Sequence, residues 1–435
     1  METNKIVKNA TWIIGCKIIK AILTLIVTMI TARYLGPSNY GLISYAASIV
    51  TFVTPIMKLG LDSIIVHEII NNPNDEGEIL GTTIVANLIS AILCIIGIFS
   101  FVSIANNGEK ETIIVCFIYS ILLIFQAIEM IQYWFQAKVL SKYSAISMLI
   151  SYIIITFIQV YISITGKSIY WFAMSYSIDF LIIAILLWVI YKRIGTQKLK
   201  FSLKAFKRMF LKSKYYIVSS MMVTIFAQTD KIMLKLMMNN ESVGFYSASV
   251  TCANMIAFVF AAIIDSIRPS IFEGRKKSKE CFESRLENLY TIIIYCSLIM
   301  SLALTLFSPL IIKILYGESY IESISSLRII VWYTTFSYLG TVRNIWIVVE
   351  NKQKYLWIIN FSGALLNIVL NYYLIPLYGI NGAAIASLIT QIFTNFVLGF
   401  IMKPIKENNK IILNSLNPKN IVEMIKKLKK PNKFN

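Results

Sequence analysis

Residues 79–104 read ILGTTIVANLISAILCIIGIFSFVSI and contain no charged side chain. An α-helix rises about 1.5 Å per residue, so a run of this length crosses a hydrocarbon layer of about 30 Å. Because lipid offers no hydrogen bonds to a bare backbone, such a run must be helical where it crosses. Similar apolar runs recur along the whole chain, which predicts an all-α polytopic membrane protein.

The composition of the chain fits this prediction. Of its 435 residues, 57% are apolar and 14% are charged, whereas a soluble domain carries about a quarter charged residues. The connections between the apolar runs are too short for a separate soluble domain. We therefore predict about twelve transmembrane helices, at residues 10–32, 40–60, 79–104, 112–132, 143–165, 168–191, 215–236, 244–267, 288–312, 325–349, 355–376 and 382–402.

The basic residues indicate the orientation of these helices. Most of the 41 lysines and arginines fall at the two ends of the chain and in connections on the same side of the membrane as those ends. The positive-inside rule assigns that side to the cytoplasm, so both termini are expected there. The same rule accounts for the formal net charge of +19, and nucleic acid is therefore not an expected partner.

The spans divide into two sets of six. In the connection between the sets, apolar residues recur at helical spacing among lysines, which suits a short helix on the membrane surface. A solvated basic loop that only sets the topology is the alternative. We predict an N-terminal six-helix lobe at residues 1–191, a cytoplasmic amphipathic linker at 192–214, a C-terminal six-helix lobe at 215–402 and a basic cytoplasmic tail at 403–435.

A weak internal repeat supports two related halves. A shift of 203 positions places Gly41 on Gly244 and Asp62 on Asp265. A repeat that begins after six spans is parallel, with its two lobes related by an axis along the membrane normal. Two such lobes around a central cleft are the arrangement expected for alternating access.

Cationic residues occur inside the predicted spans. Lys17 and Lys20 lie in the first span, Lys231 in the seventh and Arg343 in the tenth. A charge at the bilayer centre costs about 2.5–3.5 kcal/mol on insertion scales, so it needs a partner or water. We predict that these four residues line a cationic path for an anionic head group; for the first two, snorkelling to the inner face is the alternative. The predicted polar lining of this path, for which helix packing is the alternative, is Thr24, Thr28, Gln228 and Asn254.

Four aspartates are candidates for coupling or gating. Asp179 and Asp230 lie within spans, where an acid can exchange a coupling ion, and a structural ion pair is the alternative. Asp62 and Asp265 end spans at the inner face, where helix-end or gate contacts are expected. One histidine and six scattered cysteines without a CxxC pair predict no metal site. We expect no cofactor other than H+ or Na+ as a coupling ion.

Several segments resemble a known family. Residues 32–63, ARYLGPSNYGLISYAASIVTFVTPIMKLGLDS, look like the first two spans of the polysaccharide transporter family, which includes O-antigen flippases. That family belongs to the multidrug/oligosaccharidyl-lipid/polysaccharide exporter superfamily. QTDKIMLKLMMNNESVGFYSAS at 228–249 resembles its signature between the seventh and eighth spans. SPLIIKILYGESYIES at 308–323 and LYGINGAAIASLIT at 377–390 also resemble it. One departure is KSKYYIVSS at 212–220, which lacks the proline that the family often has there.

The resemblance implies a V-shaped bundle with six helices per lobe, as in the multidrug exporters of that superfamily. It also implies a flippase that moves undecaprenyl-pyrophosphate-linked oligosaccharide repeat units from the inner to the outer leaflet of the bacterial cytoplasmic membrane, for surface polysaccharide biosynthesis. The implied partners are this lipid-linked oligosaccharide, membrane lipids, a polysaccharide polymerase and assembly proteins.

Other functions require sequence features that can be checked in this chain. The chain has no Walker A loop, no second histidine and no Gly-x-Ser-x-Gly, so we do not expect an enzyme, and an ion gradient or substrate asymmetry would supply the energy. A polymerase or ligase needs a sizeable outer loop with catalytic groups, and a channel needs a pore ring. The main alternative is a cation-coupled multidrug or metabolite exporter of the same fold.

Overall fold

The computed structural model describes residues 2–195 and 197–418, apart from the side chains of residues 2–14, 17, 18, 21 and 22. This part of the protein is 90% helical, and all of its regular elements are helices. The chain divides into two compact units, Met1–Gly244 and Phe245–Asn435. We call them the N-terminal unit and the C-terminal unit and describe each by itself.

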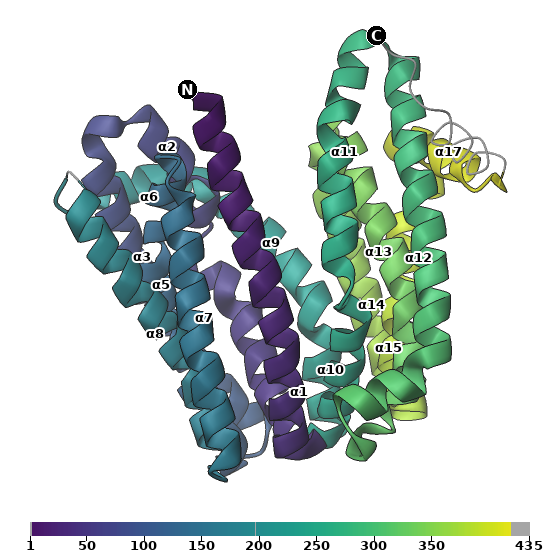
Figure 1. Ribbon diagram of the computed structural model, residues 1–435, viewed down its shortest axis with the longest axis horizontal. Helices are drawn as coiled ribbons and strands as arrows, with labels where there is room; N and C mark the ends of the chain where they lie inside the picture. The colour runs from purple at the N-terminus through teal and green to yellow at the C-terminus, as the bar shows by residue number, and fades with distance from the viewer. Residues whose placement is uncertain (1, 196, 419–435) are drawn as a thin grey trace. The chain divides into compact units, whose positions relative to one another are not determined.

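Nine helices and the start of a tenth build the described part of the N-terminal unit (Figure 1). They are α1 (Glu2–Met57), α2 (Ile65–Asn71), α3 (Glu76–Ala105), α4 (Lys110–Ser120), α5 (Leu122–Glu129), α6 (Ile131–Ala137), α7 (Ser141–Ile164), α8 (Ile169–Ile194), α9 (Leu203–Met237) and α10 (Asn240–Asn254), which continues into the next unit.

The described part of the C-terminal unit contains the rest of α10 and further helical elements, of which the last ones are short. These elements are α11 (Ala257–Lys277), α12 (Lys279–Leu315), α13 (Ser323–Val349), α14 (Leu356–Tyr378), α15 (Ile380–Ile392), a π-helix (Phe393–Val397), α16 (Leu398–Ile401) and α17 (Lys406–Ser415).

Ten segments of the described chain are long and apolar enough to cross a membrane. One of them, Leu23–Met57, contains parts of both of the first two predicted spans. The predicted span at 325–349 is present as α13 but is not among the ten; its serines, threonines and Arg343 lower its mean hydropathy. The prediction of an all-α protein with about twelve membrane helices is confirmed.

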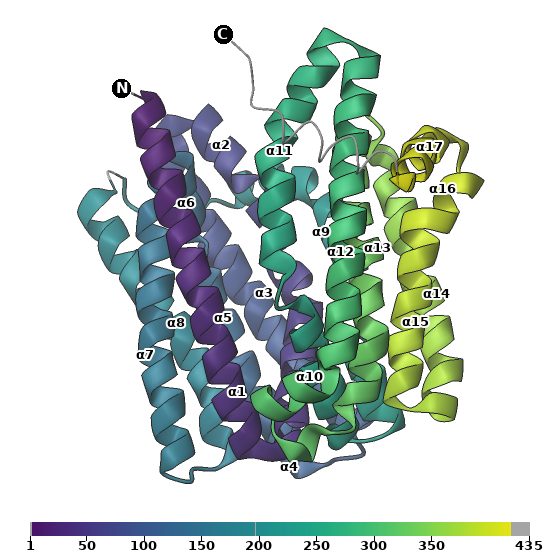
Figure 2. The same ribbon diagram turned by 45° about the vertical axis from the view of Figure 1, so that its right-hand side comes forward.

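A turn at Gly36 separates the two predicted spans within α1. Gly36 has φ 70° and ψ 172°, a left-handed value of φ that glycine adopts without the clash of a Cβ atom. Pro37 follows directly and cannot donate a helical backbone hydrogen bond. The first part of α1 therefore runs to one end of the unit, where the chain turns back (Figures 1 and 2).

The linker differs from the expected surface helix. Residues 203–214 are the first turns of α9, which Ser202 caps by accepting a hydrogen bond from the Ala205 amide at 3.2 Å. Met209 is fully buried in the core of the unit. The ammonium of Lys212 pairs with Glu68, which is itself buried, at 2.6 Å. The apolar residues of this segment thus pack against the protein, and the expectation of a separate surface helix is corrected.

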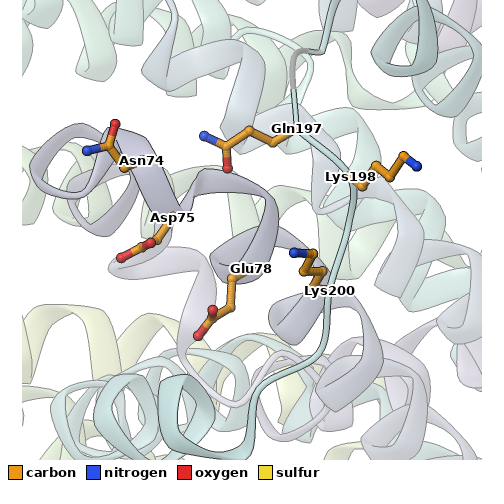
Figure 3. A pocket seen from close by; sticks show the side chains of 6 residues that line it. All are labelled: Asn74, Asp75, Glu78, Gln197, Lys198 and Lys200. Atoms are coloured by element: carbon orange, nitrogen blue, oxygen red, sulfur yellow. The ribbon is translucent and has the colours of Figure 1, made fainter.

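The extended part of the linker lies along the start of α3. The Gln197 side chain donates to the Pro73 carbonyl at 2.9 Å and accepts from the Gly77 amide at 2.9 Å. Figure 3 shows the hollow that this arrangement leaves. It is lined by Asn74, Asp75, Glu78, Gln197, Lys198 and Lys200. Its charges are mixed, so its lining favours neither anions nor cations.

The start of the tail is part of the C-terminal unit. In α17, the side chain of Asn408 accepts a hydrogen bond from the Tyr290 hydroxyl of α12 at 2.9 Å, and both residues are buried. Asn409 donates to the Phe396 carbonyl in the π-helix at 2.6 Å. Residues 403–418 are therefore folded onto the unit, and the rest of the predicted basic tail lies outside the described residues.

Candidate functional site

Lys20 lies against α7 inside the N-terminal unit. Its ammonium is 5.3 Å from the centre of the Tyr152 ring, a distance at which a cation is attracted to an aromatic face. The Thr24 hydroxyl donates to the Lys20 carbonyl at 2.7 Å and also contacts the Tyr152 hydroxyl. Lys20 is partly buried, so one helical turn of α1 presents a positive charge and a hydroxyl to α7.

Asp179 on α8 reaches the same part of α7. The Ser151 hydroxyl, one residue before Tyr152, donates to Asp179 Oδ1 at 2.5 Å and is 2.8 Å from the Asp179 carbonyl oxygen. The charges of Lys20 and Asp179 act on each other. The structure therefore brings together two candidates that the sequence places in spans one and six.

A second acid belongs to this group. Glu129 ends α5 and accepts a hydrogen bond from the Gln132 side chain at 3.2 Å. The charges of Lys58, Lys20 and Asp179 all act on it. We call Lys20, Lys58, Glu129, Tyr152 and Asp179 the N-unit polar cluster. It holds two cations and two acids, which lie in α1, just after α1, at the end of α5 and in α8.

The other predicted residues of α1 lie near this cluster along the same helix. Thr28, one turn after Thr24, is partly buried. The side chain of Lys17 lies outside the described residues, so its predicted place in the path remains a prediction. Sequence reasoning missed Ser151 and Tyr152, because a serine and a tyrosine in an apolar span are common and only the fold places them beside Asp179.

Arg343 lies in the C-terminal unit, away from any described carboxylate. Its side chain is 4% exposed, and one guanidinium nitrogen donates to the Thr394 carbonyl at 2.6 Å. Thr394 belongs to the π-helix, an element that is frequent at functional sites. The structure places Arg343 and Lys20 in different units, and their predicted common path remains a prediction.

The predicted residues of α9 and α10 have varied surroundings. Asp230 is 5% exposed, and its charge acts on the partly buried Lys231 beside it. Gln228 is partly buried on the same helix, whereas Asn254 is exposed at the end of α10. In this structure α9 packs in the N-terminal unit. From the sequence, residues 215–236 are assigned to a C-terminal lobe, and that assignment remains a prediction.

The two repeat-related aspartates make similar local pairs. Asp62 Oδ2 is 4.0 Å from the ammonium of Lys58, and Asp265 Oδ1 is 3.2 Å from the guanidinium of Arg268. Each partner is three or four residues away on the same segment. Such partly exposed local pairs contribute little to stability. Asp62 lies in the short turn Leu61–Ser63 after the end of α1, as expected, whereas Asp265 lies in the middle of α11 and not at a helix end.

Comparison with solved structures identifies the fold. The lipid II flippase MurJ in an inward closed conformation superposes with a TM-score of 0.74 at 18% identity, over 97% of this chain and 93% of that one. An inward-facing MATE family multidrug resistance transporter of the MOP superfamily gives a TM-score of 0.66 at 14% identity, over 92% and 96%. The protein therefore has the fold of these membrane transporters.

Sequence comparison gives the family. The family model described as "Polysaccharide biosynthesis protein" matches residues 6–275, more than half of the chain. The chain belongs to this family. A putative O-antigen transporter of Shigella flexneri is 26% identical over 202 residues. The match spans 46% of this chain and 48% of that protein, about half the length of each.

These comparisons confirm the resemblance that the quoted segments indicated. The chain is a multi-pass membrane protein of the polysaccharide biosynthesis protein family, and it has the fold of the flippase and the transporter with which it superposes. The two solved structures compared above are a flippase and a transporter.

Proposed function

We propose that this protein is a flippase for undecaprenyl-pyrophosphate-linked oligosaccharide repeat units. It moves the sugar and diphosphate from the inner to the outer leaflet of a bacterial cytoplasmic membrane by alternating access, with both termini in the cytoplasm. The isoprenoid tail stays among the lipids while the head group crosses. Surface polysaccharide biosynthesis then uses the translocated units, and a polymerase and assembly proteins are the expected partners.

The observation that carries this proposal is Lys20 in the N-unit polar cluster. A diphosphate cannot enter hydrocarbon, because moving an unpaired charge out of water costs far more than binding returns. A lysine ammonium is a point charge that suits phosphate oxygens. Lys20 is held against Tyr152 at 5.3 Å and is partly buried, so it presents that charge from within a membrane helix.

The acids of the cluster suggest how an ion is coupled to the substrate. Asp179 and Glu129 share the positive charge of Lys20. When a diphosphate takes over that ammonium, the acids lose part of their compensating charge and favour binding of H+ or Na+. The ion would be released with the head group at the outer side. No covalent step is required; because an ion that binds together with the substrate leaves with it, the energy of this step comes from substrate asymmetry between the leaflets and not from an inward ion gradient.

Gene deletion and complementation test this function. Deletion should abolish the surface polysaccharide and leave lipid-linked repeat units on the inner leaflet. Wild type and Lys20→Arg should restore the polysaccharide, while Lys20→Gln should not, at equal protein level. Lys276→Gln, which changes an exposed lysine of α11, is the matched control and should restore it fully. Unaltered polysaccharide after deletion would refute the proposal.

A cation-coupled multidrug or metabolite exporter is the second candidate. The two acids of the cluster favour it, because a cationic drug would bind Asp179 and Glu129 rather than Lys20. The deletion strain distinguishes the two functions: altered drug resistance with unchanged polysaccharide would identify an exporter.

A further inference from the structure

The N-terminal unit carries a second polar contact at its other end. Figure 2 shows α4 and the start of α10 at the end of this unit opposite to α2 and α6. By the distribution of basic residues, this end faces outward. Three segments meet there: the turn between α3 and α4, the turn of α1 at Gly36, and the end of α9. The proposed binding of the head group uses none of the contacts among them.

An ion pair joins α9 to the turn between α3 and α4. The ammonium of Lys235 is 2.7 Å from Glu109 Oε2. The Lys235 side chain is 9% exposed, whereas Glu109 is 41% exposed. Asn240, at the start of α10, is close enough to Glu109 to lower the pKa of that carboxyl group. The lysine is thus covered and depends on one carboxylate, while that carboxylate can exchange its partner for water.

A reciprocal glycine contact joins α1 to α10. A Cβ atom on Gly41 would collide with the Asn240 carbonyl, and one on Gly244 would collide with the Pro37 carbonyl. The same shift of 203 positions relates Gly41 to Gly244 and Pro37 to Asn240. The repeat-related segments therefore touch through their backbones, which supports the repeat. Backbones in contact without interlocking side chains can separate with little repacking.

We infer that the Glu109–Lys235 ion pair and the Gly41–Gly244 contact form a releasable outer seal, which must open once in each transport cycle. The inference rests on the proposed function for its purpose. Two properties suit these contacts to opening. Water can reach the ion pair from the exposed side of Glu109 when the pair breaks. The glycine contact is made by backbone atoms, so no side chain has to leave a packed position when the helices separate. We call these residues, with Pro37 and Asn240, the outer seal.

Cys116 provides a native reporter of the seal. It lies on α4, is 1% exposed, and is close enough to Glu109 and Lys235 for both charges to act on it. In a chain whose other five cysteines are replaced by serine, an impermeant thiol reagent added to whole cells should label it slowly. Glu109→Gln or Lys235→Gln should speed labelling about 5-fold, the factor for loss of about 1 kcal/mol. The charge exchange of Glu109→Lys with Lys235→Glu should restore slow labelling.

A cross-link tests whether the seal must open. Glu109→Cys and Lys235→Cys are combined in a chain without other cysteines and joined by a cleavable bifunctional thiol reagent. Cross-linking should stop delivery of surface polysaccharide, and cleavage of the linker should restore it; the same reagent on either single variant is the control. Normal delivery by the cross-linked chain would overturn the inference, as would labelling of Cys116 that does not change with the ion pair.

The outcome separates the seal from the function. If deletion of the gene abolishes polysaccharide while the ion pair has no effect on labelling, only the seal is wrong. If labelling follows the ion pair but deletion leaves polysaccharide unaltered, the seal stands and the proposed substrate is wrong.

Discussion

The ion pair at the start of α9 gives an asymmetric prediction. Glu68 is buried, with a side chain 3% exposed, whereas its partners Lys212 and Arg208 are 55% and 43% exposed. Glu68→Gln removes the carboxylate and leaves the positive charges of Lys212 and Arg208, both of which water can reach. Removing the nearer cation with Lys212→Gln leaves a buried carboxylate with only Arg208, at 3.6 Å. We therefore expect the second substitution to be the more damaging.

The magnitudes follow from burial. Breaking a buried pair costs about 3–5 kcal/mol when the remaining charge has no partner. Arg208 offsets part of this cost, so Lys212→Gln should destabilise the protein by about 2 kcal/mol. Glu68→Gln should cost about 1 kcal/mol, the range of an exposed pair. For a unit of this size, each kcal/mol lowers Tm by about 2–4 °C.

Thermal unfolding of the detergent-purified protein, followed by size-exclusion chromatography of heated samples, measures this difference. Lys207→Gln, which removes an exposed lysine of the same helix, is the control and should leave Tm unchanged. Equal losses for the two test variants, or a larger loss for Glu68→Gln, would refute the reasoning from burial.

Three further predictions follow from the same structure. Arg343→Lys should lower Tm and Arg343→Gln should lower it less, because a lysine keeps the buried charge without the guanidinium that reaches the π-helix carbonyl. Gly244→Ala should speed outer labelling of the native cysteine reporter by separating α10 from Pro37, and Gly97→Ala, where a Cβ meets open space, should not. Burial raises the pKa of Glu109, but the hydrogen bond and positive charge of Lys235, together with the polar groups of Thr112 and Asn240, outweigh it and hold that pKa below its usual value. Relative to Glu109→Gln at the same pH, which corrects for the falling thiolate fraction, labelling should thus stay slow from pH 7 to the usual glutamate pKa of about 4.3 and approach the rate of that variant only at lower pH.

The helices were predictable because membrane spans are set by length and hydropathy, which are local properties. The break between the first two spans was predicted, because their apolar runs stop at residue 32 and start again at 40, but the nearly continuous helical backbone that makes both spans part of α1 was not. The cytoplasmic placement of the linker stays a prediction, and its apolar side packs on the protein and not on a membrane surface. Sequence periodicity identifies an apolar face and not what covers that face.

The residues of the site that the sequence analysis missed are those whose role depends on which helices are neighbours. Lys20 and Asp179 stood out because charges in spans are rare. Ser151 and the Glu109–Lys235 pair did not, because their meaning depends on which helices are neighbours. The Thr394 carbonyl became available to Arg343 through a π-helix at Phe393–Val397, and the sequence of that segment has no feature that predicts the wider turn.

The most direct measurement is transport in proteoliposomes that contain a labelled undecaprenyl-pyrophosphate-linked oligosaccharide. Enzymatic access to the sugar on the far leaflet reports each crossing. We predict that the wild-type protein and Lys20→Arg deliver the sugar, and that Lys20→Gln delivers it no faster than protein-free vesicles. Transport by Lys20→Gln at the wild-type rate would contradict the central role of that positive charge.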